Sequence, residues 1–137
     1  MFADVDADSA EGAIELYAGE LQGIVAETGS GAVADATDLD GAVVDAIVDA
    51  DVETVGGMHL TEVASILTLV DGRDADAIVA DARDELLLAM SSAVTDVERL
   101  AAGMDIGLDP KEIQAKLEGR YPMRLREYAA LRTELVE

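Results

Sequence analysis

The sequence contains no cysteine and no tryptophan, one histidine, and only four aromatic residues, Phe2, Tyr17, Tyr121 and Tyr128. Without cysteine the chain can form no disulfide, no thiol nucleophile and no cysteine-based zinc or iron–sulfur site. A serine nucleophile would need His59 or an unusual lysine, and no G-x-S-x-G turn is present. We therefore expect a protein that is not an enzyme, with no catalytic residue, metal site, cofactor or small-molecule substrate.

Long apolar runs are also missing. The longest dense run, Leu86–Val94, contains two serines and is far shorter than the roughly 20 residues that span a bilayer. The N-terminus shows no basic and apolar signal pattern. Half of the 137 residues are apolar, and a chain of this length can bury about two-thirds of its unfolded surface. We expect one compact, soluble, cytoplasmic domain without a membrane partner.

Basic residues are scarce, whereas acidic residues are abundant. Nine lysines and arginines oppose 30 aspartates and glutamates, which gives a formal charge of −21. Such a charge destabilises a compact state by self-repulsion, but molar salt shortens the Debye length to about 3 Å and screens it. The composition resembles that of proteins from halophilic archaea that accumulate salt. The alternative, a mimic of nucleic acid or a binder of a basic partner, would concentrate the acids on one face, and they are spread from Asp4 to Asp109.

Apolar residues spaced by three and four positions predict helices along most of the chain, and the alternation typical of strands is absent. Capping residues precede several of these helices, such as Asp8 with Glu11, and Asp109 with Pro110. The expected helices lie between Asp8 and Gly29 and over residues 32–38, 41–50, 59–70, 74–102, 110–117 and 125–135, with residues 51–58 irregular and Ser91-Ser92 as a bend or break. The fold class is therefore all-α, with about seven or eight helices.

Two segments of the chain align with each other. Residues 39–50 align with residues 108–119, and residues 60–64 align with residues 125–129 after a loop that is four residues longer in the first copy. This alignment predicts an N-terminal helix (1–30), a first repeat (31–72), a long central helix (73–103) and a second repeat (104–137). The alternative, that any two amphipathic helix pairs align loosely, stays open.

Each repeat resembles the helix-turn-helix of the Cro and phage-repressor class. In the second repeat the matching residues are Leu100, Ala101, Ala102, Leu108, Asp109, Ile113, Gly119, Leu125, Tyr128, Ala129 and Leu131. Its turn, at residues 104–107, is longer than usual, and Lys116 stands where the motif has a half-buried apolar residue. Residues 83–90 and 109–131 are also similar to a small uncharacterised family of haloarchaeal proteins, and this similarity implies no activity.

The charge pattern changes at residue 111. Residues 1–110 hold three basic and 25 acidic residues, whereas residues 111–132 hold six basic and three acidic ones. The candidate contact residues of this basic segment are Lys111, Gln114, Lys116, Arg120, Arg124 and Arg126. Two interpretations remain open: these side chains contact nucleic-acid phosphates or another polyanion, or they dock the segment on acidic surface of this chain or of a second subunit. Counterion release drives DNA binding only weakly in molar salt.

Two functions are consistent with these features. The first is a non-enzymatic helical interaction or scaffold protein that forms a homodimer and contacts a partner through residues 111–132. The second is a DNA-binding transcriptional regulator that uses the second helix-turn-helix. The predicted core or dimer seam consists of Leu86, Leu88, Met90, Val94 and Val97.

Two further candidates concern metal binding and the single histidine. The spacing of Asp4, Asp6, Asp8 and Glu15 matches a calcium loop, but Ser9 replaces the required glycine. His59 lies beside a predicted helix start, where a local hydrogen bond is the favoured role.

Overall fold

The computed structural model describes residues 9–104 and 107–136, which form nine α-helices and no β-strand. The helices are α1 (Ala10–Thr28), α2 (Ser30–Ala36), α3 (Gly41–Val48), α4 (Val52–Gly56), α5 (Leu60–Asp71), α6 (Ala75–Ala93), α7 (Val97–Gly103), α8 (Pro110–Leu117) and α9 (Leu125–Val136). The predicted all-α class is confirmed. The N-cap of α1 is Ser9, whose side chain accepts a hydrogen bond from Gly12 N–H at 3.1 Å, and not the expected Asp8. Asp8 itself and the calcium-like run from Asp4 to Asp8 lie outside the described residues.

The helices divide into two halves that share order and length. Half one comprises α1 to α5 and half two comprises α6 to α9. Helices of 19, 7, 8 and 12 residues occur as α1, α2, α3 and α5 in half one and as α6, α7, α8 and α9 in half two. The five-residue helix α4 has no counterpart among the described helices of half two. The similarity in helix order and length thus includes the long first helix of each half, beyond the segments that align in sequence.

Equivalent positions of the two halves have equivalent structure. The buried residues Ala13, Ile14, Tyr17 and Leu21 of α1 correspond, 65 residues later, to the buried Ile78, Val79, Ala82 and Leu86 of α6. Ala50 after α3 and Gly119 after α8 both take positive φ angles, of 52° and 81°. In each half the main-chain N–H group of the following residue donates to a carbonyl of the helix before it. Asp51 N–H donates to the Ala46 carbonyl at 2.9 Å, and Arg120 N–H donates to the Ala115 carbonyl at 2.8 Å.

The halves meet through a short antiparallel bridge between His59 and Arg124, which precede α5 and α9. Leu60 N–H donates to the Met123 carbonyl at 2.8 Å, and Leu125 N–H donates to the Met58 carbonyl at 2.7 Å. His59 and Arg124 are themselves equivalent, 65 residues apart. Because equivalent residues pair with each other in antiparallel fashion, a pseudo-two-fold axis passes between them.

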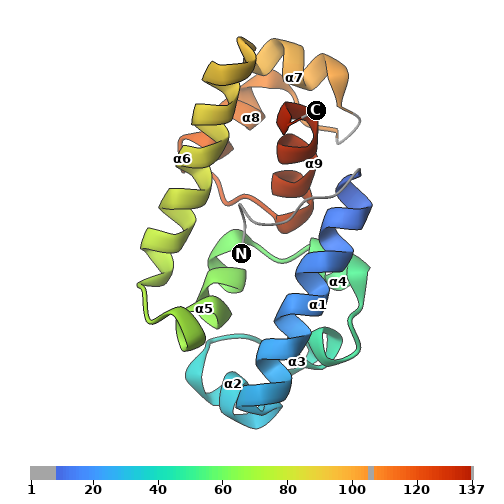
Figure 1. The fold of residues 1–137 in the computed structure, drawn as a ribbon, viewed down its shortest axis with the longest axis vertical. Coiled ribbons are helices and arrows are strands. Elements are labelled where there is room, and N and C mark those ends of the chain that lie inside the picture. The colour runs from blue at the N-terminus through green and yellow to red at the C-terminus, as the bar shows by residue number, and fades with distance from the viewer. Residues whose placement is uncertain (1–8, 105–106, 137) are drawn as a thin grey trace.

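The long helix of each half packs against the last helix of the other half: α1 contacts α9, and α6 contacts α5. Figure 1 shows α1 and α6 on opposite sides of the molecule, with α2 and α3 at one end and α7 and α8 at the other. Buried apolar residues from α1 through α9 form one continuous core. The two halves therefore share one core and pack against each other through equivalent pairs of helices.

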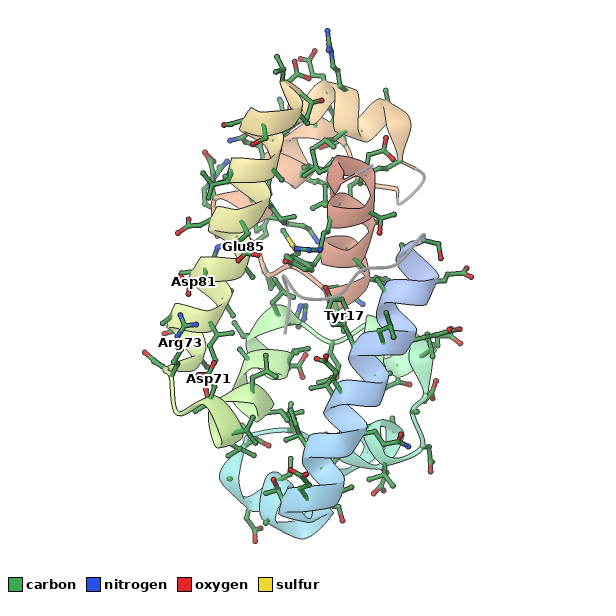
Figure 2. All side chains as sticks on the ribbon, in the orientation of Figure 1. Tyr17, Asp71, Arg73, Asp81 and Glu85 are labelled. Carbon is green, nitrogen blue, oxygen red and sulfur yellow. The ribbon has the colours of Figure 1, made fainter. Side chains whose placement is uncertain are left out.

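The two equivalent helix contacts are filled by different side chains. Tyr17 and Tyr128 pack where α1 meets α9, with ring centroids 6.5 Å apart and ring planes tilted by 57°. Figure 2 shows Tyr17 where α1 meets the N-terminal end of α9. Burial raises the pKa of both tyrosine hydroxyls above the usual value for this side chain. The equivalent positions, on α6 and α5, hold Ala82 and Val63, so the pseudo-symmetry does not extend to side-chain size.

The helix expected over residues 74–102 is two helices. α6 ends at Ala93 because Val94 adopts a left-handed conformation, with φ 51° and ψ 52°. Asp96 then accepts a hydrogen bond from Arg99 N–H at 2.9 Å and begins α7. The break thus lies just beyond Ser91-Ser92. α6 also runs along one side of the molecule rather than through its centre (Figure 1), and the stretch expected to be irregular, 51–58, contains α4.

Candidate functional site

Lys116 does not lie on the surface of the basic segment. Its ammonium group donates to both carboxylate oxygens of Glu127, at 2.7 Å each, and the two side chains are only 14% and 10% exposed. Glu127 also accepts a hydrogen bond from Arg124 N–H at 2.8 Å, and so caps α9. The equivalent residue in half one is Ile47, which is fully buried. Lys116 therefore occupies the position of a core residue of half one, is itself part-buried, and joins α8 to α9.

Arg124 and Arg132 are also partly buried. Arg124 is half-buried, and its main chain forms the bridge between the two halves. The Arg132 side chain, 22% exposed, lies 3.9 Å from the Glu85 carboxylate of α6. Arg132 corresponds to the buried Leu67 in half one. Docking within the chain, one of the two open interpretations, thus accounts for Lys116 and Arg132.

Lys111, Arg120 and Arg126 are exposed. Arg126, near the start of α9, has its Cβ close to the backbone of Gly56 in α4. Lys111 and Arg120 lie instead at the two ends of α8. The candidate contact residues therefore do not share one face, and Lys111, Arg120 and the half-buried Gln114 remain together around α8.

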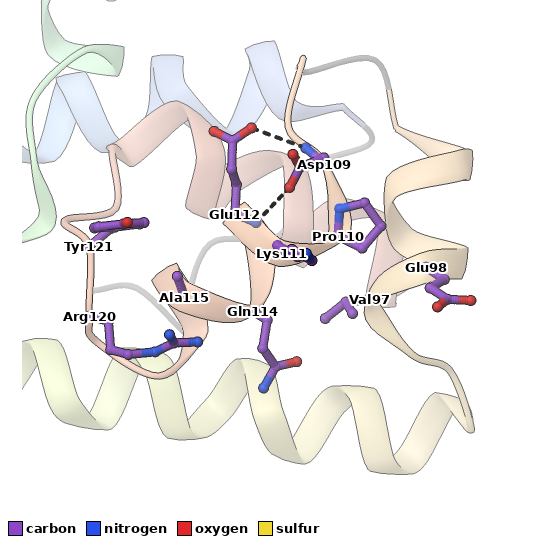
Figure 3. A pocket seen from close by; sticks show the side chains of 10 residues that line it. All are labelled: Val97, Glu98, Asp109, Pro110, Lys111, Glu112, Gln114, Ala115, Arg120 and Tyr121. Atoms are coloured by element: carbon purple, nitrogen blue, oxygen red, sulfur yellow. Dashed lines mark hydrogen bonds between the residues drawn. The ribbon is translucent and has the colours of Figure 1, made fainter.

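These three side chains line an open groove of about 590 Å³ around α8. Figure 3 shows Tyr121 and Arg120 at one end of the groove, Val97 and Glu98 of α7 at the other, and Lys111 between them. The remaining lining residues are Asp109, Pro110, Glu112 and Ala115. The exposed Tyr121, with 59% of its surface accessible, was not among the residues predicted from sequence. Its position between Arg120 and Pro122, in an extended link, is the signal that could have identified it.

Several charges in the groove are engaged within the chain. The Asp109 carboxylate accepts from Glu112 N–H at 2.8 Å, and the Glu112 carboxylate accepts from Asp109 N–H at 3.4 Å, a capping box that begins α8. Glu118 accepts hydrogen bonds from Gln114 at 3.1 Å and from Arg120 at 2.6 Å, which hold the pKa of Glu118 below its usual value.

Lys111 differs from these neighbours, because it forms no ion pair with any described residue. Its ammonium group is therefore available to a ligand of the groove.

Half one shows which groove residues the fold requires. Its residues at the positions of Lys111, Gln114, Arg120 and Tyr121 are Ala42, Asp45, Asp51 and Val52. The α3 backbone nevertheless follows the same course as that of α8, with the same N-cap residue type and the same C-terminal hydrogen bonds. Half one thus forms the equivalent helix without the groove cations and without a tyrosine at the position of Tyr121.

The predicted seam divides between core and surface. Leu86 is buried in the core of this chain, and Met90 and Val97 pack against that core. Leu88 and Val94 are exposed to 68% and 80%, and Leu87, which the prediction omitted, is exposed to 40%. These three side chains are exposed on the C-terminal half of α6 and at the residue that ends it, and we call them together the α6 patch.

The remaining basic residues serve local contacts or lie on the surface. Arg73 and Asp81 form an exposed ion pair at the start of α6 (Figure 2). The Arg83 guanidinium covers Gly119 at the end of α8, 3.0 Å from where a side-chain Cβ would lie.

His59 takes part in local structure. Its main-chain N–H group donates to the Glu62 carboxylate at 2.9 Å at the start of α5. Within residues 9–104 and 107–136, no three His, Asp or Glu side chains are grouped so as to hold a metal ion.

None of the helices in the described part of the chain has the length and apolar character needed to cross a membrane.

The comparisons with known proteins identify a family. No curated protein and no solved structure matches the chain. Residues 14–137 match the model of a protein family of unknown function, DUF5791, so the match covers both halves and nearly the whole sequence. The chain therefore belongs to the DUF5791 family.

Proposed function

We propose that this protein is a non-enzymatic helical scaffold that self-associates and holds a partner through half two. The observation that carries the proposal is the comparison of α8 with α3. Lys111, Gln114, Arg120 and Tyr121 surround α8, whereas half one builds the equivalent helix with none of these residues. Of these, Lys111, Arg120 and Tyr121 are exposed, and exposed side chains that the fold does not require are available for a contact outside the chain. The acidic, lysine-poor composition supports a cytoplasmic setting in a salt-accumulating halophile.

The α6 patch supports self-association. Leu87, Leu88 and Val94 are large apolar side chains that remain exposed on a chain of charge −21. Exposed apolar side chains that together make a large surface often mark interaction sites, and we propose that these three belong to one. Self-association would remove these side chains from water, and molar salt would strengthen that burial while it screens the repulsion between two acidic copies.

Multi-angle light scattering in molar KCl tests the self-association. We expect the mass of a dimer for the parent chain and of a monomer for a variant with Leu87→Gln and Leu88→Gln. Leu86 must be left intact, because it belongs to the core. The matched control is Leu16→Gln on α1, which replaces a leucine of similar exposure outside the patch. A monomeric parent chain, or a patch variant that stays dimeric, would contradict the proposal.

The second candidate is a DNA-binding regulator that uses α7 and α8 as a helix-turn-helix. The exposure of Lys111 on α8 favours it, since this residue could reach a groove or a phosphate. Against it stand Glu112 and Glu118, which lie exposed on the same helix segment. Fluorescence anisotropy with a labelled random-sequence duplex in molar KCl distinguishes the two candidates. The regulator requires measurable binding that is lost with Lys111→Glu and Arg120→Glu.

A further inference from the structure

We infer that Lys111 is a modification site, at which an acyl donor of the thioester class converts the side-chain amine into an amide. This inference goes beyond the proposed function, because it concerns a covalent change of this chain and not the identity of a partner. The folded chain leaves one of its two lysines open to such a donor and holds the other in an ion pair.

Folding covers the Lys116 amine. Its nitrogen donates to both carboxylate oxygens of Glu127 at 2.7 Å, and the Lys116 side chain is only 14% exposed. Amide formation needs the lone pair of the amine nitrogen and space beside that nitrogen for the acyl carbon. The Glu127 carboxylate occupies this space, so Lys116 is protected from acylation as long as the chain stays folded.

Lys111 is open to the same donor. Its side chain is exposed, lines the groove of about 590 Å³, and forms no ion pair with any described residue. Val97 and Pro110 add apolar surface to the groove, against which the apolar part of an acyl group can pack (Figure 3). Of the two lysines in the sequence, Lys111 is therefore the one that an acyl donor reaches in the folded chain.

The fold does not need the positive charge of Lys111. This residue is the second of α8, close to the positive end of the helix dipole, where a cation is unfavourable. Half one has Ala42 at the equivalent position of α3. Seven of the nine basic residues are arginines, which supply a permanent positive charge, whereas a lysine amine can also be acylated. Lys111 thus supplies an amine at a position where the helix gains nothing from a charge.

The acyl transfer balances without an oxidant or a reductant. The Lys111 ammonium group first loses one proton to water, and the lone pair of Nζ attacks the carbonyl carbon of the thioester. A C–N bond forms while the C–S bond breaks, and a second proton passes from the nitrogen to the departing thiolate. The products are a neutral amide on Lys111 and a free thiol.

Acylation changes the charge of the groove. The lining has two cations and three carboxylates, those of Lys111, Arg120, Glu98, Asp109 and Glu112. Arg120 already donates to a neighbouring carboxylate at 2.6 Å. Loss of the Lys111 charge leaves this paired arginine as the only cation among the described lining residues. Acylation would thus weaken a partner contact that uses the Lys111 ammonium group, and this consequence alone rests on the proposed function.

Peptide mass spectrometry tests which amine reacts when the full-length protein is treated with acetyl-coenzyme A in molar KCl. We expect acetylation of Lys111, no acetylation of Lys116, and loss of side-chain acetylation in Lys111→Arg. The same treatment in urea is the control, because unfolding breaks the ion pair with Glu127 and both lysines should then react. Equal acetylation of the two lysines in the folded chain, or no reaction at Lys111, would overturn the inference.

Peptide mapping of the protein isolated from growing and from stationary cells that produce it naturally tests whether the site is used. We expect an acyl group on Lys111 and none on Lys116, and an unmodified Lys111 in both samples would contradict the inference. Acetylation should leave the midpoint of thermal unfolding unchanged or raise it, since it removes a cation from the start of α8. A lowered midpoint would show that the fold uses this charge. None of these measurements involves a partner, so a dimer with an unmodified Lys111 would refute this inference and leave the proposed function standing.

Discussion

Half one and half two share a backbone plan but differ in charge. Residues 1–72, which include half one, contain 16 acidic residues and not one lysine or arginine, whereas residues 73–137 contain all nine basic residues with 14 acidic ones. Helix order, helix lengths and the hydrogen bonds that end α3 and α8 are nevertheless the same. The fold therefore does not depend on the cations of half two as a group, and each cation needs its own explanation.

Some of these cations are matched by a change elsewhere in the same half. Arg83 covers Gly119 in half two, and the equivalent residues in half one are Ala18 and Ala50. Half two thus has an arginine and a glycine at the two positions where half one has alanines. Such residues maintain packing, whereas Lys111 and Arg120 have no compensating change and lie exposed in the groove.

The largest expected effect concerns the contact between the halves. Tyr17→Ala gives α1 the residue type that α6 has at Ala82, and it should lower the free energy of unfolding by about 3–5 kcal/mol, the range for loss of a buried aromatic side chain. The cost arises because Tyr128 loses its ring partner and a cavity opens between α1 and α9. Urea denaturation in molar KCl measures it, with the exposed neighbour Leu16→Ala as control. A loss below about 1 kcal/mol would mean that the tyrosine pair does not hold the halves together.

A smaller difference is expected at the buried ion pair of half two. Glu127→Ala should destabilise by about 3 kcal/mol, because it leaves the Lys116 ammonium buried without a counter-charge and removes the cap of Arg124 N–H. Lys116→Ile should cost only about 1–2 kcal/mol, since half one has Ile47 at this position with Glu62 at the position of Glu127. Denaturation curves of both variants test the ranking. An equal or larger loss for Lys116→Ile would show that the two core positions are not equivalent.

The smallest effect is expected at the left-handed residues after α3 and α8. Ala50→Gly should stabilise by up to about 1 kcal/mol, because glycine adopts positive φ without the cost that a Cβ imposes. Gly119→Ala should destabilise by about 1–2 kcal/mol, since its Cβ is strained at φ 81° and must also displace Arg83. Thermal unfolding of the two variants checks the opposite signs. Two shifts in the same direction would break the equivalence of these helix ends.

Much of this fold could be predicted from the sequence, because capping residues and apolar spacing are local signals. Asp109 caps α8 and Pro110 begins it, as expected. The end of α6 was less accessible, since it depends on the left-handed backbone of Val94, a β-branched residue that sequence rules do not place there. The equivalence of α1 and α6 in the two halves was also missed, because the two helices share their burial pattern but few residue identities.

The candidate site was only partly predictable, because charge counts do not reveal which cations are buried. Lys116 and Lys111 are both lysines of α8. Lys116 is largely buried against Glu127, whereas Lys111 lines the groove. Tyr121 became a candidate only when the fold placed it beside Arg120, next to α8.

The central claim is that the groove residues of half two are present for a contact and not for the fold. The most direct test replaces Lys111, Gln114, Arg120 and Tyr121 together by their half-one equivalents, Ala, Asp, Asp and Val, and measures the free energy of unfolding in molar KCl. The account predicts a value within about 1 kcal/mol of the parent chain, because these side chains are exposed or half-exposed and half one folds without them. A loss of more than about 3 kcal/mol, or a variant that does not fold, would contradict it.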